Sequence, residues 1–265
     1  MKNPIRLLII LLLFNSCEDV INLDLPVDKQ FLVIETHIDY TPELTLRNYV
    51  KLSLSTSFYQ EINDPVGDAK VTLEDLTNNR NYNFTHSNNG IYILDNFTPE
   101  FNRDYRLTIT YKDELYQSTT EQLIPCVPIS KLEQGDGTLF SGNEKEVKVS
   151  FTDDGSRDDF YLFRFASNSF LVTEDRFYQG NTFNFSYFYD EDSAENDIIV
   201  SIFGITERYY NYMDIIISQT DDRGNPFGGT AANPRGNIKN ITNPENYPLG
   251  YFQLSETYSQ SLSLQ

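Results

Sequence analysis

Apolar and polar residues alternate in several short stretches of the N-terminal half. Over residues 48–56, Val50, Leu52 and Leu54 are separated by polar side chains. Successive side chains of a β-strand point to opposite faces, so this period of two predicts a half-buried strand. Further strands are expected at residues 31–38, 69–76, 82–84, 91–94, 105–111 and 115–121. Short strands separated by turn residues predict an antiparallel β-sandwich over residues 31–124.

A second β-rich region follows Pro125 and Pro128. These prolines fix the backbone and remove two hydrogen-bond donors, so we expect the domain boundary there. Alternating or continuously apolar strands are expected next, at residues 147–151, 160–165, 183–189, 198–205 and 251–254. The sequence thus predicts a mainly β fold with two β-sandwich domains of the immunoglobulin or fibronectin type, the second over residues 125–265.

One helix is predicted in the second domain, near residues 206–219. Apolar side chains recur there at the spacing of one helix face: Tyr209, Tyr212, Met213 and Ile216. Thr206 is the expected N-terminal cap. The β-branched run 215–217 is an alternative end point. We interpret the aromatic stripe as core rather than as a binding face.

The first residues are typical of an export signal. Lys2 and Arg6 precede an apolar run from Leu7 to Phe14, which spans only about 12 Å as a helix against a bilayer core of roughly 30 Å. We therefore assign residues 1–16 to a signal peptide rather than to a membrane span. Residues 17–30 are polar and form the expected tether.

The residues around Cys17 resemble a bacterial lipobox, in which the cysteine thiol is acylated and the signal is cut before it. Several acyl chains give stable anchoring, so Cys17 is the predicted lipidation site. An ordinary secretory signal with an incidental cysteine is the alternative. Glu18 and Asp19 resemble the acidic tag that sends Bacteroidota lipoproteins to the cell surface, although a solvated acidic linker fits them too.

Composition narrows the function classes. The chain has 20 basic and 39 acidic residues, a net charge of -19, so nucleic-acid binding is not expected. Only Cys126 remains once Cys17 is lipidated, which leaves no intrachain disulfide. The two histidines, His37 and His86, lie in strand-like runs, and no nucleophile-elbow, zinc-protease or phosphate-loop motif is present. We therefore expect a protein that is not an enzyme and needs no cofactor.

Two acidic loops are the remaining candidate sites. Carboxylate oxygens suit Ca²⁺, and the first loop offers Asp153, Asp154, Asp158 and Asp159. It lacks the spaced pattern of a calcium loop and contains Arg157, so a solvated hairpin loop is the favoured interpretation. In the second loop, Ser193 follows an aspartate and precedes an alanine, which resembles a Bacteroidota O-glycosylation motif.

Aromatic clusters offer a possible binding surface, because Tyr and Phe are enriched at interface centres. The candidates are residues 187–189 and 209–212. Sugar sites most often use Trp, and because the chain has none, a sugar site would have to rely on Tyr and Phe. Aromatic strands and helix stripes are more often core.

Two resemblances extend these expectations. The segments Ala69-Lys70-Val71, Gly90-Ile91-Tyr92 and Tyr105-Arg106-Leu107 resemble the carboxypeptidase-regulatory or transthyretin-like sandwich module, which implies a scaffold without catalysis. Together with Cys17, the later segments Asn225-Pro226-Phe227, Ala231-Ala232-Asn233-Pro234 and Leu249-Gly250-Tyr251-Phe252 resemble a Bacteroidota lipoprotein family of unknown function. Its members are commonly encoded beside a TonB-dependent outer-membrane receptor.

The resemblance implies a lipid-anchored protein of the outer membrane, facing the cell exterior, that serves as an accessory subunit of a β-barrel complex such as a TonB-dependent transporter. Two alternatives stay open. One is a free-standing lipoprotein that binds a glycan, metal chelate or peptide, and the other is a structural subunit of an assembly or export machine.

Overall fold

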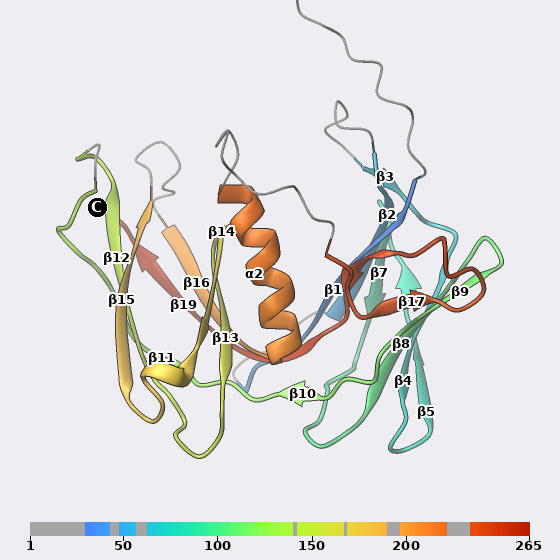
Figure 1. Ribbon diagram of the computed structural model, residues 1–265, viewed down its shortest axis with the longest axis horizontal. Helices are drawn as coiled ribbons and strands as arrows, with labels where there is room; N and C mark the ends of the chain where they lie inside the picture. The colour runs from blue at the N-terminus through green and yellow to red at the C-terminus, as the bar shows by residue number, and fades with distance from the viewer. Residues whose placement is uncertain are drawn as a thin grey trace, which may run out of the picture.

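The computed structural model describes residues 30–42, 48–56, 63–139, 142–166, 169–189, 197–221 and 234–265. Within these ranges the protein is mainly β, with three sheets and a single α-helix (Figure 1). The predicted fold class is therefore confirmed. No helix in the described ranges is both long and apolar enough to cross a membrane.

The largest sheet runs through both halves of the molecule. Its described part has 11 strands, eight of which form one continuous path. In spatial order these are β14 (Ser169–Glu174), β13 (Phe160–Ala166), β16 (Asp197–Ile205), β19 (Leu254–Ser263), β1 (Leu32–Tyr40), β2 (Asn48–Leu54), β7 (Ile91–Leu94) and β6 (Thr85–His86). Three short strands join it at the side: β10 (Leu123–Ile124), β18 (Leu249–Tyr251) and β3 (Asp64–Pro65).

Two smaller sheets pack on one face of this sheet and make two sandwich-like halves. The five-stranded sheet covers β1, β2 and β7 and consists of β17 (Ile238–Asn240), β9 (Glu114–Ser118), β8 (Tyr105–Tyr111), β4 (Lys70–Asp75) and β5 (Arg80–Asn83). The three-stranded sheet covers β13 and β16 and consists of β11 (Ile129–Gln134), β12 (Lys145–Thr152) and β15 (Thr182–Tyr189). Each half therefore has its own apolar core.

Side-chain alternation agrees with the sequence pattern in most of these strands. In β8, Tyr105, Leu107 and Ile109 are buried, as predicted. Thr72 of β4 lies between Val71 and Leu73 and is buried like them, and its hydroxyl donates a hydrogen bond to Asn83 Oδ1 at 3.1 Å. A polar side chain with a partner of this kind can occupy a buried position at low cost.

The end of the chain returns to the first half. Strand β19 pairs in parallel with β1 and antiparallel with β16, so it belongs to both halves. Ile238, Phe252 and Leu254 are part of the first core, although the predicted boundary places them in the second domain. The expected last strand 251–254 is interrupted: Tyr251 ends β18, and Leu254 begins the longer β19.

Helix α2 (Glu207–Asp221) confirms the predicted helix. The Tyr209 N–H donates to the Thr206 hydroxyl at 3.1 Å, which is the expected cap. The helix continues through residues 215–217. It lies against β13 and β14 (Figure 1), where Met213 packs on Leu162 and Phe203. A short 3-10 helix, η1 (Asp175–Phe177), follows β14.

Gly90 occupies the turn that precedes β7. Its φ of +74° lies in the left-handed region, and a Cβ atom there would be 2.1 Å from the carbonyl oxygen of Leu52. The Leu52 N–H in turn donates to the Gly90 carbonyl at 2.8 Å. Only glycine combines this conformation with so close an approach.

Candidate functional site

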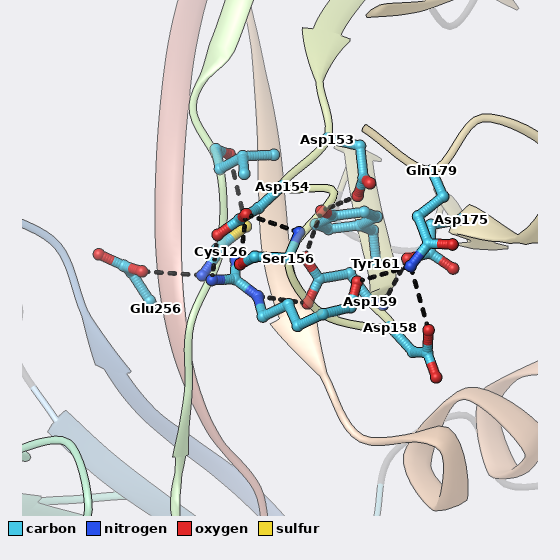
Figure 2. A network of polar contacts seen from close by, with 12 residues as sticks. Cys126, Asp153, Asp154, Ser156, Asp158, Asp159, Tyr161, Asp175, Gln179 and Glu256 are labelled. Atoms are coloured by element: carbon cyan, nitrogen blue, oxygen red, sulfur yellow. Dashed lines mark hydrogen bonds and ion pairs between the residues drawn. The ribbon is translucent and has the colours of Figure 1, made fainter. Parts of the chain in front are cut away.

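The acidic loop between β12 and β13 forms a closed polar network (Figure 2). The hydroxyl of Tyr161 lies 2.6 Å from Asp153 Oδ1 and 3.0 Å from Asp159 Oδ2. Both aspartates are buried, at 5% and 4% exposure. Neither the calcium hypothesis nor the solvated-loop interpretation anticipated two buried carboxylates around a tyrosine.

Protein groups supply the hydrogen bonds that these carboxylates require. Asp153 Oδ2 accepts the Gly180 N–H at 2.7 Å, and Asp159 Oδ1 accepts Arg157 Nε at 2.7 Å. A third buried carboxylate, Asp175, accepts the Asp159 N–H at 2.7 Å. The network therefore ties the loop to η1 and to the start of β15.

Two other members of the predicted calcium set lie closer to solvent. Asp154 accepts bonds from Ser156 and Arg157, and Asp158 accepts one from Gln179 at 3.1 Å. The hydrogen bonds from Ser156 lower the pKa of Asp154, whereas burial raises that of Asp159. In the described ranges, no group of three or more His, Cys, Asp or Glu is arranged to hold a metal ion.

Cys126 lies beside this network and is a structural residue. Its N–H donates a hydrogen bond to Glu256 Oε2 of β19 at 2.8 Å (Figure 2). This bond connects β19 to the segment between β10 and β11 that links the two halves. Burial raises the pKa of its thiol well above the ordinary value, so the reactive thiolate is disfavoured.

The other predicted sites fall elsewhere. Cys17, Glu18 and Asp19 lie outside the described residues, and so does Ser193. The aromatic candidates at residues 187–189 pack in the second core, where Tyr187 stacks on Phe165 at 3.9 Å between ring centres. The Tyr189 hydroxyl donates to the Phe165 carbonyl at 2.8 Å, so these rings do not form an exposed sugar platform.

A cavity of about 710 Å³ opens on the opposite face of the large sheet, next to α2. In β1, β13 and β16, alternate side chains point into the two cores, so the intervening ones point to this other face. The described residues that line it are Glu35, Thr36, His37, Asp39, Tyr49, Leu162, Arg164, Phe165, Phe170, Tyr189, Asp197, Ile198, Ile199, Ser201, Phe203, Tyr209, Met213, Gln253 and Ser255. Both halves of the molecule thus contribute to one hollow.

Arg164 is the cation of this cavity. It is half-buried in β13, and its guanidinium lies 5.2 Å from the centre of the Phe203 ring, a cation–π contact. It makes no ion pair or side-chain hydrogen bond with any residue that the structure describes.

Asp39 and His37 stand across the cavity on β1. Burial raises the pKa of Asp39 to about 7, although the Arg164 guanidinium opposes the rise. Burial and Arg164 lower the pKa of His37, which stacks on Tyr49 with 4.4 Å between ring centres. Neither side chain is hydrogen-bonded to another described residue. At neutral pH the site therefore holds a neutral His37 imidazole and a partly protonated Asp39 carboxyl group.

Backbone and rim contacts fix this end of β1. The Asp39 N–H donates to Asn48 Oδ1 at 3.0 Å, and Asn48 Nδ2 donates to the Phe97 carbonyl at 2.9 Å. Glu35 is paired with Lys51 at 2.9 Å, so its charge is already compensated. Among the lining residues that the structure describes, Arg164 is therefore the cation without a paired anion.

Sequence analysis did not identify this site. Arg164 lies in the predicted strand 160–165, and Glu35 and His37 lie in the predicted strand 31–38, whereas Asp39 follows that strand. One signal was available: a lone arginine among aromatic residues 160–165, and polar residues at every second position of 35–39. Sequence cannot show that these segments, which are distant along the chain, share one sheet face.

The fold and the cavity define a class of protein: a mainly β chain with two sandwich-like halves that share one sheet and enclose a ligand-sized hollow beside a helix. The chain belongs to the family described as a domain of unknown function, DUF4249, whose model matches residues 18–261. No curated protein matches it.

Proposed function

We propose that this protein is a lipid-anchored, non-enzymatic subunit of an outer-membrane β-barrel complex, with a TonB-dependent transporter as the barrel. The single observation that carries the proposal is Cys17 at the end of an export signal, followed by a polar tether and a folded β domain that begins near residue 32. The family resemblance to lipoproteins encoded beside such receptors supports the choice of partner. The acidic tag at Glu18 and Asp19 supports a location on the cell surface.

The anchor gives a physical mechanism for the partnership. A lipid on Cys17 confines the domain to the membrane surface and raises its effective concentration near the barrel, so a weak contact becomes persistent. The domain then caps the barrel or passes ligand to it.

The anchoring step is tested by Cys17→Ala in the native host. We expect the Cys17→Ala variant to leave the membrane fraction and to lose incorporation of a labelled fatty acid. Cys126→Ala is the control, and it should stay in the membrane fraction and still incorporate the label. The partner is tested by extraction of the tagged wild-type protein in mild detergent, which should co-purify a β-barrel. Recovery of the wild type as a lone monomer contradicts the partnership, and full membrane retention of Cys17→Ala contradicts the anchor.

The surface location has its own test. Protease treatment of intact cells should cleave the wild-type protein, and Glu18→Gln with Asp19→Asn should protect it. Equal protection of both proteins places the domain on the inner face instead.

The cavity favours a second candidate, a free-standing ligand-binding lipoprotein. Its volume of about 710 Å³ lies within the range of small-molecule sites. Ligand binding by the purified lipoprotein, together with absence of any co-purified barrel, would support this second role.

A further inference from the structure

We propose that the cavity between β1, β13 and α2 binds a small organic monocarboxylate, and that Arg164 pairs with its carboxylate. The inference concerns this chain's own cavity and holds whether the protein acts beside a barrel or alone. It names a chemical class of ligand, an anionic head with an apolar body.

Arg164 differs from other half-buried arginines of the chain. Two of these have carboxylate partners: Arg106 pairs with Glu74 at 2.5 Å, and Arg157 with Asp159 at 2.7 Å. Arg164 is half-buried like these two but has no such partner in the described ranges. In a chain of net charge -19, a partly buried cation without an anion is unusual. A carboxylate ligand would complete the bidentate pair that a guanidinium fork favours.

The nearest acid does not neutralise Arg164. Asp39 lies close enough to feel the guanidinium charge, yet it makes no ion pair with it. Because burial raises the pKa of Asp39 to about 7, much of this carboxyl is protonated at neutral pH. A protonated Asp39 is a hydrogen-bond donor and can serve the second oxygen or a neighbouring polar group of the ligand.

The cavity also has an apolar wall that suits the body of such a ligand. Leu162, Phe203 and Met213 form this wall where α2 packs on the sheet, and Phe170 extends it. Such a wall stabilises a hydrocarbon or aromatic group by removing it from water. Arg164 lies at the edge of this wall, with its guanidinium 5.2 Å from the centre of the Phe203 ring. The cavity therefore combines a cation with an apolar surface, as an apolar acid requires.

Charge balance favours one carboxylate over a more highly charged anion. Arg164 is the cation without a paired anion among the lining residues that the structure describes, while the carboxylates of Glu35, Asp39 and Asp197 also face the cavity. A phosphate dianion would add a second negative charge near these groups. Repulsion between this second charge and the carboxylates is unfavourable in a partly desolvated site.

The experiment uses the full mature lipoprotein in detergent micelles and titration calorimetry. The probes are 3-phenylpropionate and octanoate, with 3-phenylpropionamide and inorganic phosphate as matched comparisons. We expect each carboxylate to bind at least ten-fold more tightly than the amide and than phosphate. This comparison uses the wild type alone, so it does not depend on the folding of any variant.

Substitutions then test the assignment to Arg164. Arg164→Gln should weaken carboxylate binding at least ten-fold and leave amide binding unchanged, and Arg164→Lys should fall between Gln and wild type. Arg176→Gln, at an exposed arginine of η1, is the control and should bind as wild type. Circular dichroism checks that each variant is folded.

Four results would overturn the inference: no carboxylate binding, equal binding of acid and amide, tighter binding of phosphate than of the carboxylates, or undiminished carboxylate binding by folded Arg164→Gln. None of these outcomes bears on the anchor at Cys17 or on the barrel partner, which are tested by extraction from native membranes.

Discussion

The side chain of Asn237 pairs with both backbone groups of Phe252. Asn237 Nδ2 donates to the Phe252 carbonyl at 2.8 Å, and Asn237 Oδ1 accepts the Phe252 N–H at 2.8 Å. The same Nδ2 also reaches Glu121 Oε1 at 2.8 Å. All three residues are buried. The Asn237 amide therefore makes the two hydrogen bonds that a neighbouring β-strand would make with Phe252. It does so where the C-terminal segment packs into the first core.

Asn237→Ala should lower the free energy of unfolding by about 2 to 4 kcal/mol, because two buried backbone groups lose their partners. Denaturant unfolding measures the change. The exposed Asn88 provides the control, and Asn88→Ala should stay within about 0.5 kcal/mol of wild type. Equal effects of the two substitutions would show that water replaces the Asn237 amide without cost.

Tyr161→Phe tests the acidic network. Removal of the hydroxyl leaves Asp153 and Asp159 buried with one partner fewer, so we expect a loss of about 1 to 3 kcal/mol in unfolding free energy. Tyr187→Phe is the matched control in the same core, because no described residue is hydrogen-bonded to the Tyr187 hydroxyl. If both variants unfold alike, the network contributes nothing to stability.

Gly90→Ala tests the turn before β7. The substitution combines positive φ with a clash against the Leu52 carbonyl, and should cost about 2 to 5 kcal/mol. Gly142 allows the cost of positive φ to be measured without the clash. Its φ is +80°, but a Cβ atom added there would meet nothing within 4 Å. Gly142→Ala should therefore cost only about 1 to 2 kcal/mol. Thermal unfolding of both variants gives the difference, and equal losses would assign the whole effect to φ.

The raised pKa of Asp39 leads us to expect that stability depends on pH. Burial raises its folded-state pKa from 3.8 to about 7, so the folded protein holds the proton more tightly than the unfolded chain does. Its contribution to the unfolding free energy therefore falls as pH rises from about 4 to about 7. The charged and titratable groups around it are Glu35 and His37 on β1, Tyr49 on β2, Arg164 on β13 and Tyr209 on α2.

Asp39→Asn mimics the protonated form at every pH. We expect the variant to gain stability relative to wild type as pH increases through this window, measured by urea unfolding at several pH values. Glu133→Gln, in an exposed ion pair with Lys131, is the control and should keep the wild-type profile. A constant difference between Asp39→Asn and wild type would contradict the raised pKa.

Local patterns predicted the strands of the N-terminal half because each strand buries one face against a core. Val50 and Leu52 alternate with polar residues, and both are fully buried in β2. The helix was predictable for the same reason, since Thr206 and Met213 mark its start and its buried face. Strand β19 was harder to predict because Glu256 and Gln260 stand between Leu254, Tyr258 and Leu262 on its core-facing side. These two polar residues interrupt the apolar period.

The cavity was beyond sequence analysis for a topological reason. Arg164 and Asp39 are 125 residues apart in the sequence and share one sheet face only because β19 lies between β16 and β1 and pairs with both.

The buried aspartates were also hidden, because an acidic run such as residues 153–159 usually indicates solvent. These carboxylates lie inside because the Tyr161 hydroxyl, the Arg157 guanidinium and the Gly180 N–H donate hydrogen bonds to them.

The first core also has a consequence for the order of events during synthesis. It includes Ile238, Phe252 and Leu254, so it cannot close until almost the whole chain is available. The N-terminal half therefore cannot complete its core before the strands of the second half have been synthesised.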